Sequence, residues 1–193
     1  MSNDERGGHR VLEIDVVVWR GMTSKQRRLF QFLDNVFICE SIRSRIMEML
    51  EGMSTGRISG RLLYWMTTNF SKSQGLYIVT DALTTNVWES YNARLKEWNR
   101  HSFDPFCRRG APALEFCGHV TSLAQLHFLY WAVATGVAEF TRENAERITK
   151  HQEQAMRRVK ERKKGGNSKR TQISPVRIHG AVGFNQTHDP RIF

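Results

Sequence analysis

Apolar residues in the first third of the chain recur at steps of three and four, which is typical of helices that bury one face. The pattern predicts a helix running through Phe37, with Thr23 or Ser24 as its N-terminal cap. A second helix is expected over 42–50 and should end at Gly52. After a loop of small residues at 53–60, a short apolar helix is expected over 62–66.

The same periodicity returns in the second half of the chain. A helix through Trp98 is expected after Thr84 or Thr85, with Trp88, Tyr91, Leu95 and Trp98 on one face. The strongly apolar stretch 123–135 predicts a buried helix capped by Thr121 or Ser122 and ended by Gly136. From Val137, one further helix is expected to continue to about Lys164, where Gly165 stops it.

Three short segments have the β-branched or alternating pattern of strands. They cover 12–19, 76–80 and 114–117, and loops are expected at 71–75 and 101–112. No internal repeat of 20–50 residues occurs, so solenoid architectures are excluded. The predicted fold is mainly α with a small β-sheet, an α+β body with extended N- and C-terminal arms.

Composition divides the chain into four parts. Residues 1–10 are polar and predict a flexible N-terminal arm, and 11–146 predict a compact globular body. Residues 147–171 form a basic helix end and linker, and 172–193 an extended C-terminal arm.

The basic segment explains the net charge of +10. Residues 147–170 hold ten Lys or Arg and two Glu, so they contribute 10 − 2 = +8, whereas 1–146 hold 17 basic and 16 acidic residues, or +1. Such a segment attracts nucleic acid, an anionic membrane surface or an acidic protein. An alternative of equal weight is that this segment is a solvated helix end with a solubilising tail and binds no polyanion. The candidate polyanion-binding residues are Arg157, Arg158, Lys160, Arg162, Lys163, Lys164, Lys169 and Arg170.

The C-terminal arm carries more apolar residues than a solubilising tail requires. We expect it to bind a neighbouring protein, in preference to packing on its own body. The candidate partner-binding residues are Val176, Ile178, Val182, Phe184, Ile192 and Phe193.

Candidate chemistry is sparse. The chain lacks phosphate-binding glycine loops and nucleophile-elbow motifs, and its three cysteines are typical of a reducing compartment. It also lacks a transmembrane span and a signal-peptide core, which predicts a protein kept inside a cell. Zinc-type ligands occur at His101, Cys107, Cys117 and His119, and arginines follow Cys107.

The spacing of these four residues differs from known structural zinc sites, and nothing identifies a third group for a catalytic Cys107. We favour an ordered turn in which Phe103 and Phe106 enter the core and Asp104 caps local amides. The sequence therefore predicts a non-enzymatic protein without cofactor, metal or catalytic residues.

The segment from Tyr91 through Phe-Asp-Pro-Phe-Cys-Arg at 103–108 resembles a group of poorly characterised proteins of large nucleocytoplasmic DNA viruses. The helix containing Leu126–Trp131 and the basic tail at 160–170 continue the resemblance, which covers about 76–164. It implies a viral protein that is packaged in the particle.

Two functions follow from these observations. The first is a structural protein of the virion, a minor capsid protein whose arms bind major and minor capsid proteins in a hetero-oligomeric assembly. It would pass through the host cytoplasm or nucleus during assembly. The alternative is a non-specific nucleic-acid-binding protein of the virion core or viral transcription machinery, acting through the basic tail.

Overall fold

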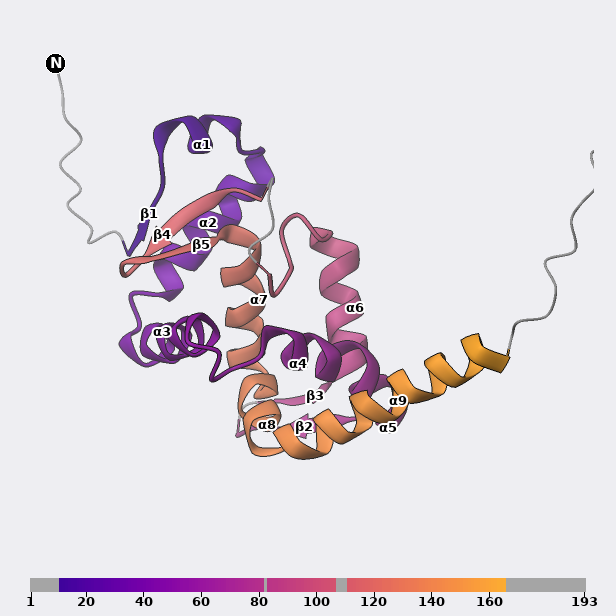
Figure 1. Ribbon diagram of the computed structural model, residues 1–193. Helices are drawn as coiled ribbons and strands as arrows, with labels where there is room; N and C mark the ends of the chain where they lie inside the picture. Colours follow the sequence, from indigo (N-terminus) through magenta and orange to yellow (C-terminus); the bar gives the residue numbers. More distant parts are fainter. Residues whose placement is uncertain (1–10, 82, 107–110, 166–193) are drawn as a thin grey trace, which may run out of the picture. The chain divides into compact units, whose positions relative to one another are not determined.

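The computed structural model describes residues 11–81, 83–106 and 111–165 (Figure 1). This part of the chain is mainly helical with small antiparallel sheets, which confirms the predicted fold class. Contacts divide the chain into two units, 1–157 and 158–193. The predicted arms at 1–10 and 172–193 lie outside the described residues, as does the linker from residue 166.

The N-terminal strand prediction is wrong over most of its length. Strand β1 is only Leu12–Glu13, and helix α1 follows at Val16–Gly21. The Asp15 side chain accepts hydrogen bonds from the amides of Val17 and Val18, so it caps a helix where the β-branched run suggested a strand. The residues before α1 are fixed by Asp34, whose carboxylate accepts hydrogen bonds from the amides of Val11 and Leu12 at 2.9 Å each.

Helices α2 (Ser24–Val36) and α3 (Glu40–Ser54) follow the predicted periodicity. Thr23 caps α2 in a reciprocal capping box with Gln26. Gly52 does not end α3, which corrects the prediction. It lies within the helix, and the Ile58 side chain packs so closely against it that a Cβ there would lie 2.5 Å from Ile58 Cδ1.

The predicted loop at 71–75 is mostly helical. Helix α4 (Gly60–Trp65) continues through a π-helical turn, η1 (Met66–Phe70), into α5 (Ser71–Gln74). The hydroxyls of Thr67 and Ser71 donate to the carbonyls four residues earlier, so these residues are accommodated within the helix. Gly75, with φ of 54°, ends it.

Strand β2 (Tyr77–Val79) confirms the prediction at 76–80, but its partner β3 (Thr84–Asn86) was not predicted. Thr84 and Thr85 belong to this strand, and Asn86 caps helix α6 (Val87–Trp98) in their place. The hairpin needs Thr84 and Thr85 as pairing residues, which is why the cap lies later than expected.

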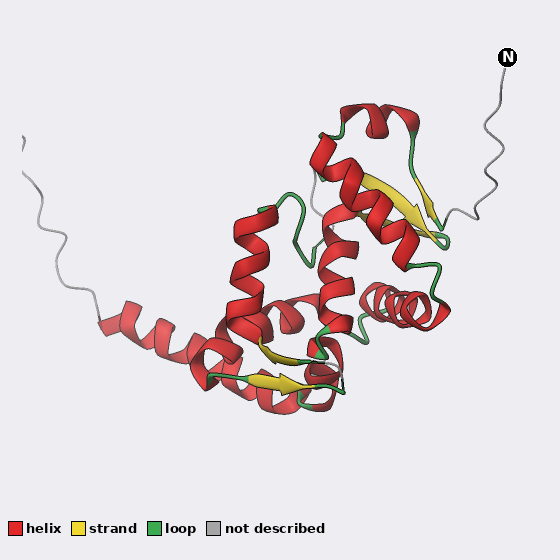
Figure 2. Cartoon of the chain, turned by 180° about the vertical axis from the view of Figure 1, so that it is seen from behind, coloured by secondary structure: helices red, strands yellow, loops and turns green. Residues whose placement is uncertain are grey.

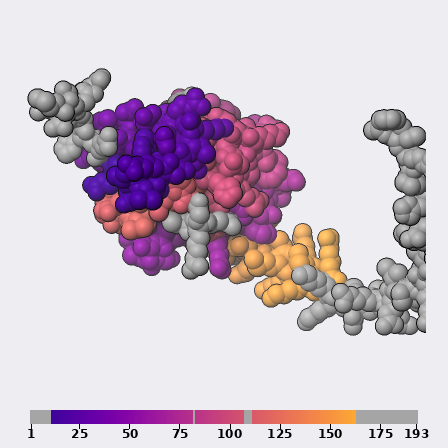
Figure 3. Space-filling view, turned by 90° about the horizontal axis from the view of Figure 1, so that it is seen from above, coloured from indigo at the N-terminus to yellow at the C-terminus, as the bar shows by residue number. Residues whose placement is uncertain are grey.

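The second sheet brings together distant parts of the chain. Strands β4 (Ala113–Phe116) and β5 (His119–Ser122) form a hairpin, and β1 pairs with β4, giving the order β1-β4-β5. The strand predicted at 114–117 is thereby confirmed, whereas β5 was not predicted. Figure 3 shows the indigo N-terminal residues against later, salmon-coloured residues on one face.

Helix α7 (Leu123–Ala134) is capped by Ser122 and followed by Gly136 with φ of 73°, as predicted. The single helix expected from Val137 is two helices, α8 (Val137–Glu143) and α9 (Ala145–Gly165). They separate at Asn144, whose side chain donates to the carbonyl of Phe140. Helix α9 is described as far as Gly165, and the residues that follow this predicted stop lie outside the described part of the chain.

Helix α7 is the centre of the core. Most of its residues are buried, and it packs against α2, α3, α8 and strand β5 (Figures 1 and 2). Phe103 is fully buried, as expected, and Phe106 contacts the ring of Tyr64. The Asp104 carboxylate accepts the Phe106 amide, which confirms its predicted capping role.

Gly136 provides a test of how the β2–β3 hairpin is held. A Cβ at this position would lie 3.0 Å from Thr80 Cγ2 and 3.1 Å from Ile78 Cγ2, at a backbone φ of 73°. Gly56 has a similar φ of 75° with nothing near its Cβ position. We expect G136A to destabilise the protein by more than G56A, which carries only backbone strain of about 1 kcal/mol. Denaturant unfolding of both variants checks this; equal losses would mean that the hairpin contact is unimportant.

Candidate functional site

The β2–β3 hairpin presents an unpaired strand edge. Thr80 and Leu83 exchange backbone hydrogen bonds at its end, and the Val87 amide donates to the Leu76 carbonyl at its base. Hydrogen-bonded and non-hydrogen-bonded pairs alternate in an antiparallel ladder, so Tyr77 and Val79 fall at the non-hydrogen-bonded positions. Their N–H and C=O groups therefore point away from β3. Among the described residues this sheet has only two strands.

The side chains on this edge are as exposed as its backbone. Ile78 is buried against the body, whereas Tyr77 is 60% exposed and Val79 is 74% exposed. Leu83, near the hairpin turn, is also exposed. A free edge with apolar side chains is a template for another extended chain, because main-chain bonds and side-chain contacts become available together.

A groove of about 820 Å³ lies beside the hairpin. Tyr77, Ile78 and Val79 line one part of it, and helices α3, α4, α7 and α8 supply most of the remainder. Its apolar lining includes Ile42, Met49, Ile58, Leu62, Val133 and Ala138. The groove therefore offers an apolar surface continuous with the exposed edge of β2.

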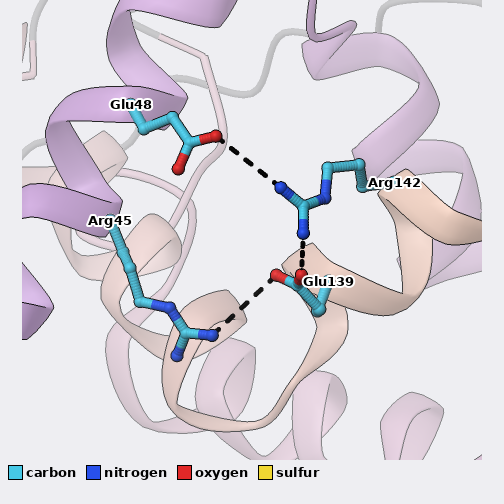
Figure 4. A network of polar contacts seen from close by, with 4 residues as sticks. All are labelled: Arg45, Glu48, Glu139 and Arg142. Carbon is cyan, nitrogen blue, oxygen red and sulfur yellow. Dashed lines mark hydrogen bonds and ion pairs between the residues drawn. The ribbon is translucent and has the colours of Figure 1, made fainter.

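Two ion pairs between helices α3 and α8 form the charged side of this groove (Figure 4). Arg45 lies 3.9 Å from Glu139, and Arg142 lies 3.7 Å from Glu48. Arg142 also pairs with Glu139 one turn away on α8. All four side chains are at least two-fifths exposed, so each pair contributes little to stability.

The charges around the groove nearly cancel. Its basic residues are Arg45, Arg57 and Arg142, and its acidic ones are Glu48, Asp81, Glu139 and Glu143, which gives 3 − 4 = −1. A polyanion would gain little here. A near-neutral polar rim around an apolar floor suits a polypeptide.

Six of the eight candidate polyanion-binding residues lie at the end of helix α9. Arg157, Arg158, Lys160 and Arg162 are exposed; Lys163 and Lys164 continue the helix, and Lys169 and Arg170 lie outside the described residues. The partner-binding residues of the C-terminal arm lie outside them too.

The start of α9 is firmly attached to the body. Ile148 is fully buried, and the Trp65 indole N–H donates to His151 Nδ1 at 3.1 Å. With Nδ1 as acceptor, the neutral ring carries its proton on Nε2, which lies 3.1 Å from the Ser73 hydroxyl. Phe70 packs edge-on against the same ring. Sequence periodicity identified α9 but gave no signal for these partners, which come from η1 and α5.

The suggested zinc-type residues are only partly described, because Cys107 lies outside the described part. Cys117 is exposed in the tight turn between β4 and β5, with φ of 49°. His119 Nε2 lies 3.9 Å from a Glu51 carboxylate oxygen. In the described ranges, no three His, Cys, Asp or Glu side chains gather closely enough to hold a metal ion. No described helix is long and apolar enough to cross a membrane.

The comparison with protein families covers most of the chain. Residues 13–181 match the model of DUF7197, a family of unknown function. The chain belongs to this family. Its match extends well beyond the segment around Phe-Asp-Pro-Phe-Cys-Arg that first indicated a viral resemblance.

A relative of this DUF7197 chain occurs in a giant virus. The uncharacterized protein L507 of Acanthamoeba polyphaga mimivirus is 26% identical over 135 residues, which cover 64% of this chain and 51% of that protein. The chain thus spans about half the length of the relative. This similarity supports the giant-virus context that the sequence motif indicated. No solved structure matches the chain.

His127 is a buried titratable group that the sequence did not single out. Its Nδ1–H donates to the Ser102 carbonyl at 2.7 Å, and Trp98 and Phe103 pack around the ring. Burial lowers the pKa of His127 to about 4, against the opposing effect of the Ser102 bond. The only sequence signal is its position in a strongly apolar helix.

Folding should therefore depend on pH through His127. Because its pKa is about 4 when folded and about 6.5 when unfolded, the unfolded chain binds the extra proton between these values. Stability is full above pH 6.5 and falls as the pH drops toward 4, by up to about tenfold in the unfolding equilibrium per pH unit. H127Q should flatten this slope in urea titrations. H101Q controls for loss of an exposed histidine; an unchanged slope in H127Q would contradict the assignment.

Proposed function

We propose that this protein is a non-enzymatic structural component of a large DNA virus particle. In its specific form, the proposal is a minor capsid protein whose terminal arms bind neighbouring capsid proteins. The mimivirus relative supports the viral context, although its own role is uncharacterized. The structural context is a helical body with a surface that suits a polypeptide partner.

The observation that carries the proposal is the free edge of β2 beside an apolar groove. Tyr77 and Val79 offer backbone groups and apolar side chains to the same occupant, and the groove charges nearly cancel. A partner of this kind is an extended polypeptide, since a strand satisfies the edge and covers the apolar residues at once.

The basic end of α9 favours the alternative function, non-specific nucleic-acid binding in the virion core or transcription machinery. Arg157, Arg158, Lys160 and Arg162 are exposed close together on one helix, without aromatic residues among them. Such a group would contact phosphates without reading bases.

Removing the C-terminal arm tests the structural role. We expect deletion of 172–193 to leave the helical circular dichroism and thermal midpoint of the body unchanged, because the described core lies between residues 11 and 157. Incorporation into particles should be lost, since the arm supplies the contact to neighbours. Incorporation is measured by mass spectrometry of the fractions from particles disrupted in steps. The full-length chain should be released in the same fraction as the outer-shell proteins. Release with the genome would instead support the alternative, and absence from particles would exclude both roles.

Neutralising the basic end of α9 tests the alternative. In a variant with R157Q, R158Q, K160Q and R162Q, binding to duplex DNA should weaken, and the slope of log affinity against log salt should fall by about 3–4 if all four residues contact phosphates. The matched control removes four exposed charges elsewhere, as R20Q, R28Q, R61Q and K96Q. Fluorescence anisotropy at several salt concentrations measures both. Equal weakening in the two variants would show a general charge effect and remove the basis for a binding site on α9.

A further inference from the structure

The free edge of β2 narrows the choice of occupant. The occupant must be extended, because the unpaired N–H and C=O groups of Tyr77 and Val79 lie two residues apart along a strand. It must also be apolar at alternate positions, because both exposed side chains lie on the same side of the strand. Finally, it needs little net charge opposite a groove whose charges sum to −1.

The chain itself contains a segment with this pattern. Val176 and Ile178 alternate with Arg177 and His179, and the residue before them, Pro175, has no N–H to pair. A strand starting at Val176 therefore provides two apolar side chains in the same period as Tyr77 and Val79. These residues lie outside the described part, so the inference rests on their sequence and on the geometry of the edge.

We propose that the segment 173–184 of a second copy of this chain binds along β2, with its residues 176–179 added as a third, antiparallel strand. Val176 and Ile178 then lie opposite Val79 and Tyr77, and their backbone groups pair with the outward N–H and C=O groups. Residues 166–175 span up to about 35 Å when extended, which is enough to reach an adjacent molecule. The inference rests on the proposed structural function, because it gives the C-terminal arm its receiving surface.

Strand β5, an edge strand of the three-stranded sheet, fits this role less well and provides a control. Strand β5 ends the three-stranded sheet, and its Val120 is 81% exposed. Its neighbours Thr121 and Ser122 are buried, so β5 offers one exposed apolar residue where β2 offers two. It also lies outside the groove lining.

Self-association of the full-length chain tests the edge. A lysine on an edge strand opposes pairing with another strand, so V79K should lower the association constant in analytical ultracentrifugation by tenfold or more. The reciprocal change, I178K, should have a similar effect. V120K adds the same charge on the edge strand β5 and should leave association unchanged. Equal losses in V79K and V120K, or a wild-type chain that stays monomeric at high micromolar concentration, would overturn the proposal.

Cross-linking between isotopically distinct copies identifies the occupant. A photoreactive phenylalanine replaces Tyr77 in ¹⁵N-labelled chain, which is then mixed with unlabelled chain. Mixed-isotope cross-links from position 77 to 173–184 are the expected product. Cross-links confined to single isotopes would show that each arm binds its own body, and mixed cross-links to any other segment would overturn the assigned occupant. If cross-linking excludes 173–184 of a second copy as the occupant, this inference fails. The proposed structural function is still tested independently by the incorporation of the chain into particles.

Discussion

The burial of helix α7 is the constraint on which the rest of the body depends. Nearly every residue from Leu123 to Ala132 is inaccessible, so neighbouring elements must cover the helix on all sides. Polar groups on a surrounded helix must be satisfied internally, because a buried unpaired group costs about 1–3 kcal/mol. Thr121 donates to the Gln125 side-chain carbonyl, and the Gln125 amide donates to the Pro105 carbonyl.

The segment after α6 is fixed in place by this requirement. The amide of Asp104 donates to the Ala124 carbonyl, and the carbonyl of Ser102 accepts from His127. Residues 102–106, which include the described part of the Phe-Asp-Pro-Phe-Cys-Arg segment, thus pack across α7, with the Phe103 side chain buried in the core. This arrangement gives the motif a structural role in the core, independent of any chemistry at its cysteine.

The candidate binding surface is a consequence of the same packing. The α7–α8 turn at Gly136 allows the hairpin to approach closely, and α3 and α8 then complete the groove beside β2. The hairpin directs one of its strand residues, Ile78, into the body and leaves Tyr77 and Val79 outside. The site therefore depends on elements from three separated parts of the chain.

The sequence by itself determined the helices with strong periodicity, the mainly helical class with small sheets, and two caps to within one residue, which the structure places at Thr23 and Ser122. These features depend on neighbours a few residues away, so local pattern is sufficient. Tertiary structure decided the continuation of α3 through Gly52 and the pairing of β3, because each depends on a packing or pairing partner that composition does not indicate. The helix Val16–Gly21 has a local cap, Asp15, and was missed because its β-branched run is typical of a strand. Tertiary structure also decided the groove and the free edge of β2, since a surface built from α3, α4, α7, α8 and a hairpin has no local signature.

The basic residues of α9 were identifiable from the sequence because charge is a property of the sequence itself. The attachment of that helix to the body through His151 depends on residues of η1 and α5, so only the tertiary structure decided it.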